Sequence, residues 1–329
     1  MKKMFTILIL LMGILLLTSC SKAADKVPES NAKATISPTD ITGNKTLTKE
    51  ELTVGILPAE SAIPLILAKE KGFFEAEGVT VTIQSFSSPN DRNAAVQSKE
   101  LDGVIGDVMT SAAFVDKGIP MKITSDISED FKILSSPKSG ITKMDQLGGK
   151  KISLVPNFIL EYIMDQFATK YGFQYKIVEI PSFSGRSEAL LSDQIDGVVF
   201  TEPQAGMLVT QGAHLLGSSK EAGIKGGTLM FTNDTITKHP KAIKAFYKAY
   251  HKAIEYMNET DASKYSDILT KYQFPEAISD YLTSLNGTFQ YAGSIEKKQF
   301  DHIIEWTKKK KLISKSYTYE ELTDFSFLE

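Results

Sequence analysis

The sequence predicts an α/β fold with two lobes, each built around a mainly parallel β-sheet flanked by helices. The first observation is an internal repeat, because a shift of 94 residues places 92–118 over 186–212 without a gap. The second is that short strand patterns alternate with helix patterns throughout both copies. Alternating units of this kind form a parallel sheet covered by helices on both faces.

The two copies read RNAAVQSKELDGVIGDVMTSAAFVDKG and RSEALLSDQIDGVVFTEPQAGMLVTQG. Both contain Asp-Gly-Val, at 102–104 and 196–198, and both end on glycine, Gly118 and Gly212. Each copy predicts a helix, an Asp-Gly turn, a buried strand, a loop and a second helix. The alternative is that two unrelated α/β units resemble each other by chance. Two lobes are expected in that case too.

The segments before each copy also match, as a strand stopped by proline and then a helix. These lie at 52–58 and 63–71 in the first lobe, and at 151–156 and 158–171 in the second. Gly72 and Gly172 follow the helices at the position that requires a left-handed residue. A second strand ends in Ser-Phe, at 85–86 and at 182–183. The β-α-β-α-β-α unit therefore occurs twice.

The remaining sequence predicts a strand at 226–234 followed by helices from Ile236 onward. In HPKAIKAFYKAYHKAIEYM, apolar residues recur at a helical spacing that covers a core. We expect these helices to complete the first lobe. The chain then leaves the first lobe near 125–132 and returns near 227–233, and two crossings make a hinge.

The amino terminus has the layout of a secretory signal, with Lys2 and Lys3 before an apolar run at 5–17. That run has 13 residues, and a helix needs roughly 20 to cross a bilayer. Leu-Thr-Ser-Cys at 17–20 resembles the lipobox of bacterial lipoproteins, in which the cysteine is lipidated and the chain is cut before it. Cys20 is the only cysteine, so it has no disulfide partner. The alternative is a plain signal peptide with an incidental cysteine.

Residues 21–50 contain few large apolar groups and cannot bury enough surface to fold. We therefore expect five segments along the chain. These are a signal peptide at 1–19, lipidated Cys20 and a flexible tether at 20–50, the first part of lobe one at 51–128, lobe two at 129–228, and the return to lobe one with C-terminal helices at 229–329. This organisation predicts a lipid-anchored domain on the outer face of the cytoplasmic membrane.

Composition excludes several functional classes. The net charge is −3, and removal of Lys2 and Lys3 with the signal leaves −5, so a nucleic-acid partner is not expected. We interpret the basic run at 308–311 as a solvated helix end. The four histidines show neither a close zinc pair nor a nucleophile partner, and the chain has no Gly-rich phosphate loop. We expect no catalytic residue, metal or cofactor.

Three segments carry a family resemblance: AKEKGFFE at 68–75, DQLGGKKI at 145–152 and IDGVVFTEPQAG at 195–206. From residue 52 to about 258, the chain resembles the extracytoplasmic substrate-binding proteins of ABC importers in the SsuA/THI5-like (NMT1-like) family. This family handles sulfonates, nitrate and thiamine-type pyrimidines. The resemblance implies a periplasmic-binding-protein-like clamshell that closes on its ligand. It also implies a monomer that works with an ABC permease and its ATPase.

Ligands of such folds bind beyond the carboxyl ends of the strands, so the loops that follow the strands form the expected site. The expected ligand contacts are Glu60, Ser61, Ser88, Arg92, Asp107, Thr110, Asn157, Phe158, Ser184, Arg186 and Glu202.

Several of these residues also have a structural interpretation. Glu60 could accept N–H groups from a ligand or favour the dipole of the next helix, and Ser61 and Asp107 could be ligand contacts or helix N-caps. Glu202 resembles the family's acidic residue before proline, which favours a ligand contact.

Ser88 and Ser184 precede predicted helices whose free N–H groups can hold an anion. Arg92 and Arg186, at matched positions in those helices, either complete an anion site or form structural salt bridges. Aromatic residues near these loops could stack on a flat ring or fill the core; they are Phe86, Phe158, Tyr162 and Phe183.

The expected function is capture of a small polar molecule for import. Two carboxylates, Glu60 and Glu202, favour a ligand with N–H donors, such as an aminopyrimidine, over a bare sulfonate or nitrate. Two alternatives remain. One is a lipid-anchored sensor or adhesin without a transporter, and the other is a pyrimidine-synthesis-type enzyme, because some relatives make the thiamine pyrimidine.

Overall fold

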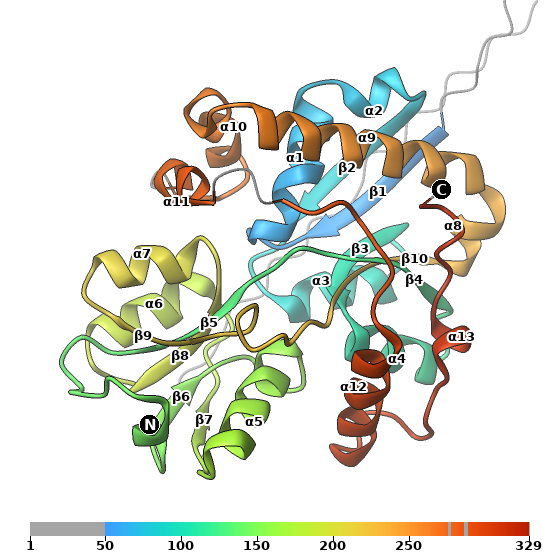
Figure 1. Ribbon diagram of the computed structural model, residues 1–329. Helices are drawn as coiled ribbons and strands as arrows, with labels where there is room; N and C mark the ends of the chain where they lie inside the picture. The colour runs from blue at the N-terminus through green and yellow to red at the C-terminus, as the bar shows by residue number, and fades with distance from the viewer. Residues whose placement is uncertain (1–49, 276–277, 286–288, 329) are drawn as a thin grey trace, which may run out of the picture. The chain divides into compact units, whose positions relative to one another are not determined.

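The computed structural model describes residues 50–275, 278–285 and 289–328. Within them the strands form two five-stranded sheets (Figure 1). The first sheet has the order β2 (Val79–Ser85), β1 (Glu50–Ile56), β3 (Gly103–Asp107), β10 (Gly227–Thr232) and β4 (Met121–Asp126). The second has the order β7 (Lys176–Val178), β6 (Lys151–Ser153), β8 (Gly197–Thr201), β5 (Phe131–Ser135) and β9 (His214–Ser218). The predicted α/β class is confirmed.

Each sheet is mixed, with one strand opposed to the others. In the first sheet β10 runs antiparallel to β3 and β4, and in the second β5 runs antiparallel to β8 and β9. Both opposed strands are the first strand after the chain crosses between sheets, at 127–130 and at 219–226. We call each sheet with its helices a lobe, so the two crossings join the lobes.

Helices cover the sheets in the order that the repeat predicts. The first lobe has η1 (Glu60–Ala62), α1 (Ile63–Glu70), α2 (Phe73–Ala76), α3 (Pro89–Gln97) and α4 (Val108–Asp116). The second has η2 (Met144–Leu147), α5 (Ile159–Tyr171), α6 (Phe183–Leu191) and α7 (Gln204–Thr210). Gly72 and Gly172 are left-handed, with φ of 73° and 71°, as predicted.

Hydrogen bonds repeat at the same interval as the sequence. Arg92 Nη1 donates to the Ile105 carbonyl at 2.8 Å, and Arg186 Nη1 donates to the Val199 carbonyl at 3.3 Å. Both members of the second pair lie 94 residues after their counterparts in the first. The same shift relates the helix N-caps Ser88 and Ser182, and the positive-φ residues Lys99 and Asp193. The repeat is thus confirmed in the bonding of individual side chains.

The C-terminal part is helical, as predicted. Its helices are α8 (Asn233–Lys238), α9 (Pro240–Glu259), η3 (Ala262–Lys264), α10 (Ser266–Thr270), α11 (Ile278–Ser284), α12 (Lys297–Lys309) and α13 (Tyr319–Leu322). Helix α9 completes the first lobe, because Phe246 stacks on Phe74 with ring centroids 5.1 Å apart and also contacts Phe231 of β10.

Helix α12 departs from the prediction, because it contacts both lobes. It packs on α4 of the first lobe. Its Trp306 ring lies edge-on to Tyr162 of α5, with centroids 5.6 Å apart, and Trp306 Nε1 donates to Asp165 at 2.9 Å. Lys310, just beyond α12, pairs with Glu161 at 2.6 Å and with Asp165 at 2.9 Å. Residues 308–311 are all exposed, so the interpretation of this run as a solvated helix end is confirmed, and Lys310 forms its ion pairs at the surface.

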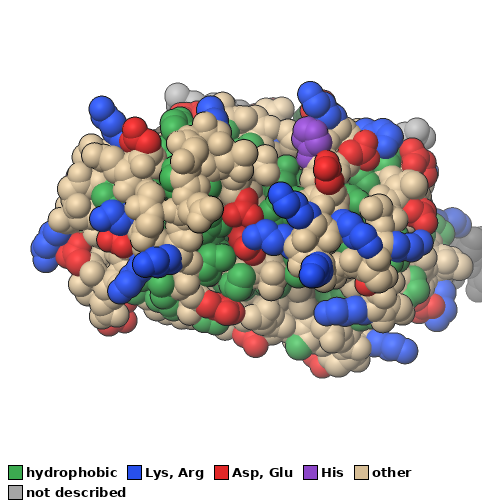
Figure 2. All heavy atoms as spheres, turned by 90° about the horizontal axis from the view of Figure 1, so that it is seen from below, with side chains coloured by type: hydrophobic (Ala, Val, Ile, Leu, Met, Phe, Trp, Pro, Cys, Tyr) green, Lys and Arg blue, Asp and Glu red, His purple; other side chains and the backbone are tan. Residues whose placement is uncertain are grey.

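Charges on the surface are mixed in sign. On the face shown in Figure 2, acidic side chains are interspersed among lysine and arginine side chains. Among the described helices, none combines the length and apolar character needed to cross a membrane. Cys20 and the expected signal peptide and tether lie outside the described residues.

Candidate functional site

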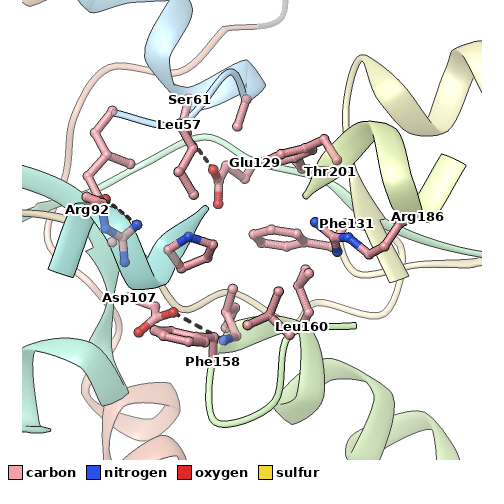
Figure 3. Close-up of a pocket in the computed structure, with 17 residues that line it drawn as sticks. Leu57, Ser61, Arg92, Asp107, Glu129, Phe131, Phe158, Leu160, Arg186 and Thr201 are labelled. Carbon is pink, nitrogen blue, oxygen red and sulfur yellow. Dashed lines mark hydrogen bonds between the residues drawn. The ribbon is translucent and has the colours of Figure 1, made fainter. Parts of the chain in front are cut away.

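A small cavity lies among the loops where the two lobes meet. Its volume is about 70 Å³, which is room for on the order of five water molecules. Arg92 and Arg186 approach it from opposite sides, with Glu129 above and Asp107 and Phe158 below, in the view of Figure 3. We call it the interlobe cavity.

The structure brings five of the expected contact residues together in this cavity. They are Ser61, Arg92, Asp107, Phe158 and Arg186. The repeat is the sequence signal that found both arginines.

Arg92 is buried and tied to its own lobe. Besides its bond to Ile105, Nε and Nη2 both donate to Asn93 Oδ1, at 3.1 and 3.0 Å. Burial lowers the pKa of Arg92, whereas the nearby charges of Asp107 and Glu129 raise it.

Arg186 is equally buried, at 1% exposure, but has fewer polar partners. Its guanidinium lies over the rings of Phe200 and Phe183, 4.4 and 5.1 Å from their centroids. Its Nε is buried and has no hydrogen-bond partner among the described residues. Burial lowers the pKa of Arg186 to about 10. Neither arginine makes a salt bridge within the described part of the chain, so the alternative of a structural salt bridge is wrong for both.

Glu129 is a cavity residue that sequence reasoning missed. It lies in the first crossing between the lobes and accepts a hydrogen bond from Ser61 Oγ at 2.5 Å. The pKa of Glu129 is raised to about 7, chiefly by burial and also by the Asp107 charge, while the Ser61 hydrogen bond and Arg92 oppose the rise. Its sequence signal was an acidic pair, Glu129 and Asp130, inside a predicted crossing.

Asp107 combines the two roles that the sequence left open. It caps α4, because Oδ1 accepts the Thr110 backbone N–H at 2.8 Å, and it also lines the cavity. Its second oxygen accepts the Ile159 N–H at 3.1 Å, at the start of α5 in the other lobe. Burial raises the pKa of Asp107.

Glu60 and Glu202 lie on a different cavity, of about 540 Å³, together with Asp130, Lys132 and Tyr281. Glu60 Oε2 accepts a hydrogen bond from Tyr281 at 2.5 Å, and the Glu60 N–H donates to the Glu202 carbonyl at 3.0 Å. Burial raises the pKa of Glu60 to about 8. The two carboxylates that favoured a ligand with N–H donors are thus outside the interlobe cavity.

The other expected contacts are more peripheral. Ser88 caps α3 by accepting the Asp91 N–H at 3.2 Å. Thr110 and Asn157 line a third cavity, of about 430 Å³. Ser182 is the N-cap of α6, so Ser184 lies within the helix, where its side chain is exposed. The prediction that Ser184 precedes this helix is wrong.

Two of the four aromatic candidates line the interlobe cavity. These are Phe158 and Phe183, and Phe131 of β5 joins them. Tyr162 packs against Trp306 and belongs to the core, and Phe86 packs beside the apolar cluster of α3 and β3.

Comparison with known proteins gives a family and a fold. The NMT1/THI5-like family model matches residues 60–262. A 4-amino-5-hydroxymethyl-2-methylpyrimidine phosphate synthase of Schizosaccharomyces pombe is 26% identical over 227 residues. That alignment covers 63% of this chain and 65% of the synthase, so the chain spans slightly under two thirds of this relative.

Solved structures match more of the chain at lower identity. The ligand-binding component of an ABC-type import system from Staphylococcus aureus, with zinc bound, superposes with a TM-score of 0.71 at 16% identity, covering 85% of this chain and 98% of that one. The alkanesulfonate-binding protein SsuA of Xanthomonas axonopodis pv. citri, bound to MOPS, gives 0.71 at 17% identity, covering 83% and 97%. The two-lobed binding-protein fold is confirmed.

Proposed function

The chain belongs to the NMT1/THI5-like family, and from that premise we propose that it is the substrate-binding protein of an ABC importer. It captures a small polar molecule in the interlobe cavity and delivers it to a membrane permease served by an ATPase. The observation that carries the proposal is a small cavity between the lobes, beyond the carboxyl ends of β1, β3 and β8 and lined by charged side chains of both lobes.

Capture would use the hinge formed by the two crossings. The lobes already touch through polar bonds, because Gln204 Nε2 donates to the Pro58 carbonyl at 2.8 Å and the Glu60 N–H donates to Glu202. A ligand that contacts both lobes stabilises the arrangement in which they meet, and so shifts the population toward closure.

We further propose that Cys20 carries the lipid that holds a monomeric protein on the outer face of the cytoplasmic membrane. The Cys20→Ala variant should lose labelling by palmitate and leave the membrane fraction. Equal labelling in both proteins would contradict the anchor.

We propose that the cavity binds its ligand without converting it. A bound ligand should therefore be recovered unchanged after prolonged incubation with the protein, as chromatography can show. Turnover would favour an enzyme.

The test of binding is a thermal-shift screen against aminopyrimidines, thiamine, riboflavin, taurine, alkanesulfonates, nitrate and bicarbonate. A ligand at about 100 times its dissociation constant adds roughly 2.7 kcal/mol of stability, or a few degrees. Leu160→Trp, which fills the interlobe cavity from α5, should abolish the shift, whereas Lys170→Trp on exposed α5 surface should keep it. An equal shift in Leu160→Trp would place the ligand elsewhere.

Import itself is tested in cells. Uptake of the ligand found in the screen should fall when the gene is deleted and recover with the wild-type protein but not with Leu160→Trp. Unchanged uptake would favour the sensor or adhesin alternative.

A further inference from the structure

We propose that the captured molecule is a small organic anion and that Arg186 holds its anionic group. This inference rests on the proposed binding function and specifies the class of ligand. It differs from the aminopyrimidine that the sequence favoured.

The first observation is the bonding of Arg186. Its guanidinium lines the interlobe cavity, and its buried Nε has no partner among the described residues. Its one side-chain hydrogen bond to a described residue, the Val199 carbonyl, is long at 3.3 Å. Because a buried charge is costly unless it is paired and hydrogen-bonded, such a side chain is suited to binding an anion.

The second observation is the contrast with Arg92, its counterpart in the repeat. Arg92 bonds to Asn93 and lies near the charges of Asp107 and Glu129. In the repeat, the positions of Asn93 and Asp107 correspond to those of Ser187 and Thr201 in the second lobe.

These two replacements remove the partners of the arginine in the second lobe. The Ser187 hydroxyl donates to the Phe183 carbonyl at 3.1 Å instead of bonding to Arg186, and Thr201 carries no charge. Neither arginine has a carboxylate within 4.0 Å among the described residues, but the charges of Asp107 and Glu129 raise the pKa of Arg92, whereas burial alone acts on the pKa of Arg186. The second lobe thus keeps the arginine of the repeat, but no carboxylate in the second lobe takes the place of Asp107.

Two aromatic rings hold the Arg186 guanidinium in position. The guanidinium contacts Phe183 and Phe200, whose rings stack on each other with centroids 5.8 Å apart, and contact with aromatic faces orients a cation. In Figure 3 the Arg186 side chain points toward Phe131 and the centre of the cavity. A ligand at this place meets a charged guanidinium group that is held in one orientation. The planar N–H donors of such a group suit a carboxylate or a sulfonate.

The rest of the cavity describes the body of the ligand. Leu57, Ile105, Phe131, Phe158 and Leu160 supply apolar walls. With a volume of about 70 Å³, less than half of the roughly 150 Å³ that holds benzene, the cavity suits an acid with a short apolar chain rather than one with an aromatic ring.

The test compares acids with their neutral amides. Acetate, propionate and methanesulfonate are each titrated beside acetamide, propionamide and methanesulfonamide, with the melting temperature as the readout. We expect at least one acid to raise the melting temperature by several degrees while its amide does not. The carboxylate and sulfonate arms show which acid group the site prefers.

Two matched arginine variants supply the second readout. Arg186→Met should weaken binding of the effective acid at least about 30-fold, and Arg186→Lys should retain part of it. Without ligand, Arg186→Met should melt at or above the wild-type temperature because it removes a buried charge without a counter-charge. Arg92→Met should melt lower, because it leaves Asp107 and Glu129 without the cation.

The inference is overturned if no acid binds, if amides bind as well as acids, or if Arg186→Met binds the acid like the wild type. The acid and amide comparison in the wild type holds even if a variant fails to fold. An aminopyrimidine that stabilises wild type and Arg186→Met equally would leave the binding function standing and remove this inference. Failure of every compound, including the panel of the proposed function, would remove both.

Discussion

Replacement of Glu60 by glutamine should flatten the pH dependence of stability. Glu60 is 5% exposed, and burial raises its pKa from 4.5 to about 8. The Tyr281 hydrogen bond opposes this rise, and the charges of Glu129, Glu202 and Asp130 add to it.

The direction follows from proton binding. Between pH 4.5 and 8 the folded protein holds a proton on Glu60 that the unfolded chain has released. The unfolded state then binds fewer protons, so the free energy of unfolding decreases as the pH rises through this window. At 1.36 kcal/mol per pKa unit, the full effect is about 5 kcal/mol, of which about 3 kcal/mol falls between pH 5.5 and 8.

Urea unfolding at pH 5.5 and pH 8 measures this difference. Wild type should lose about 3 kcal/mol more than Glu60→Gln between the two conditions, because glutamine accepts the Tyr281 bond and does not titrate. Glu51→Gln makes the same substitution on the exposed side of β1 and should follow the wild type. Parallel curves for wild type and Glu60→Gln would show that Glu60 is ionised in the folded protein and refute the reasoning.

Two further predictions concern packing and the C-terminal helix. Gly197→Ala should cost about 1–3 kcal/mol in urea unfolding, because its Cβ would lie 2.8 Å from the Leu134 carbonyl oxygen. Gly148→Ala, with 3.6 Å to the nearest atom, should stay near wild type, and an equal loss in both would contradict the clash. Lys310→Met should lower stability by about 1 kcal/mol in low salt and less in high salt, whereas exposed Lys309→Met should have little effect. A loss for Lys310→Met that does not change with salt would rule out its ion pairs as the cause.

The fold could be predicted because the chain repeats its own pattern. Matching turns at Gly72 and Gly172, and matching Asp-Gly-Val strands, are local features that a sequence displays directly. The position of α12 could not be predicted in this way. Its apolar stripe shows that one face is buried, but the stripe does not say which lobe covers it.

The site was predicted in part, for the same reason. The repeat identified Arg92 and Arg186, because paired positions in two similar lobes face a common cavity. Glu129 lies in a crossing with no periodic pattern, so only tertiary packing reveals where its carboxyl points. Ser184 was misassigned because Ser182, two residues earlier, satisfies the same N-cap requirement. Glu60 lies in an expected loop, but its bond to Tyr281 of α11 directs it to another cavity.

Helix α12 also limits how the lobes can move. Its apolar residues belong to one continuous core with α4, β5 and α5. Any rotation of one sheet against the other therefore has to slide α12 over α4 or strain its bonds to α5, through Trp306 and Lys310. Helix α12 thus restrains the movement of the two lobes relative to each other. Under the proposed binding function, we therefore expect α12 to influence ligand release although it does not line the interlobe cavity.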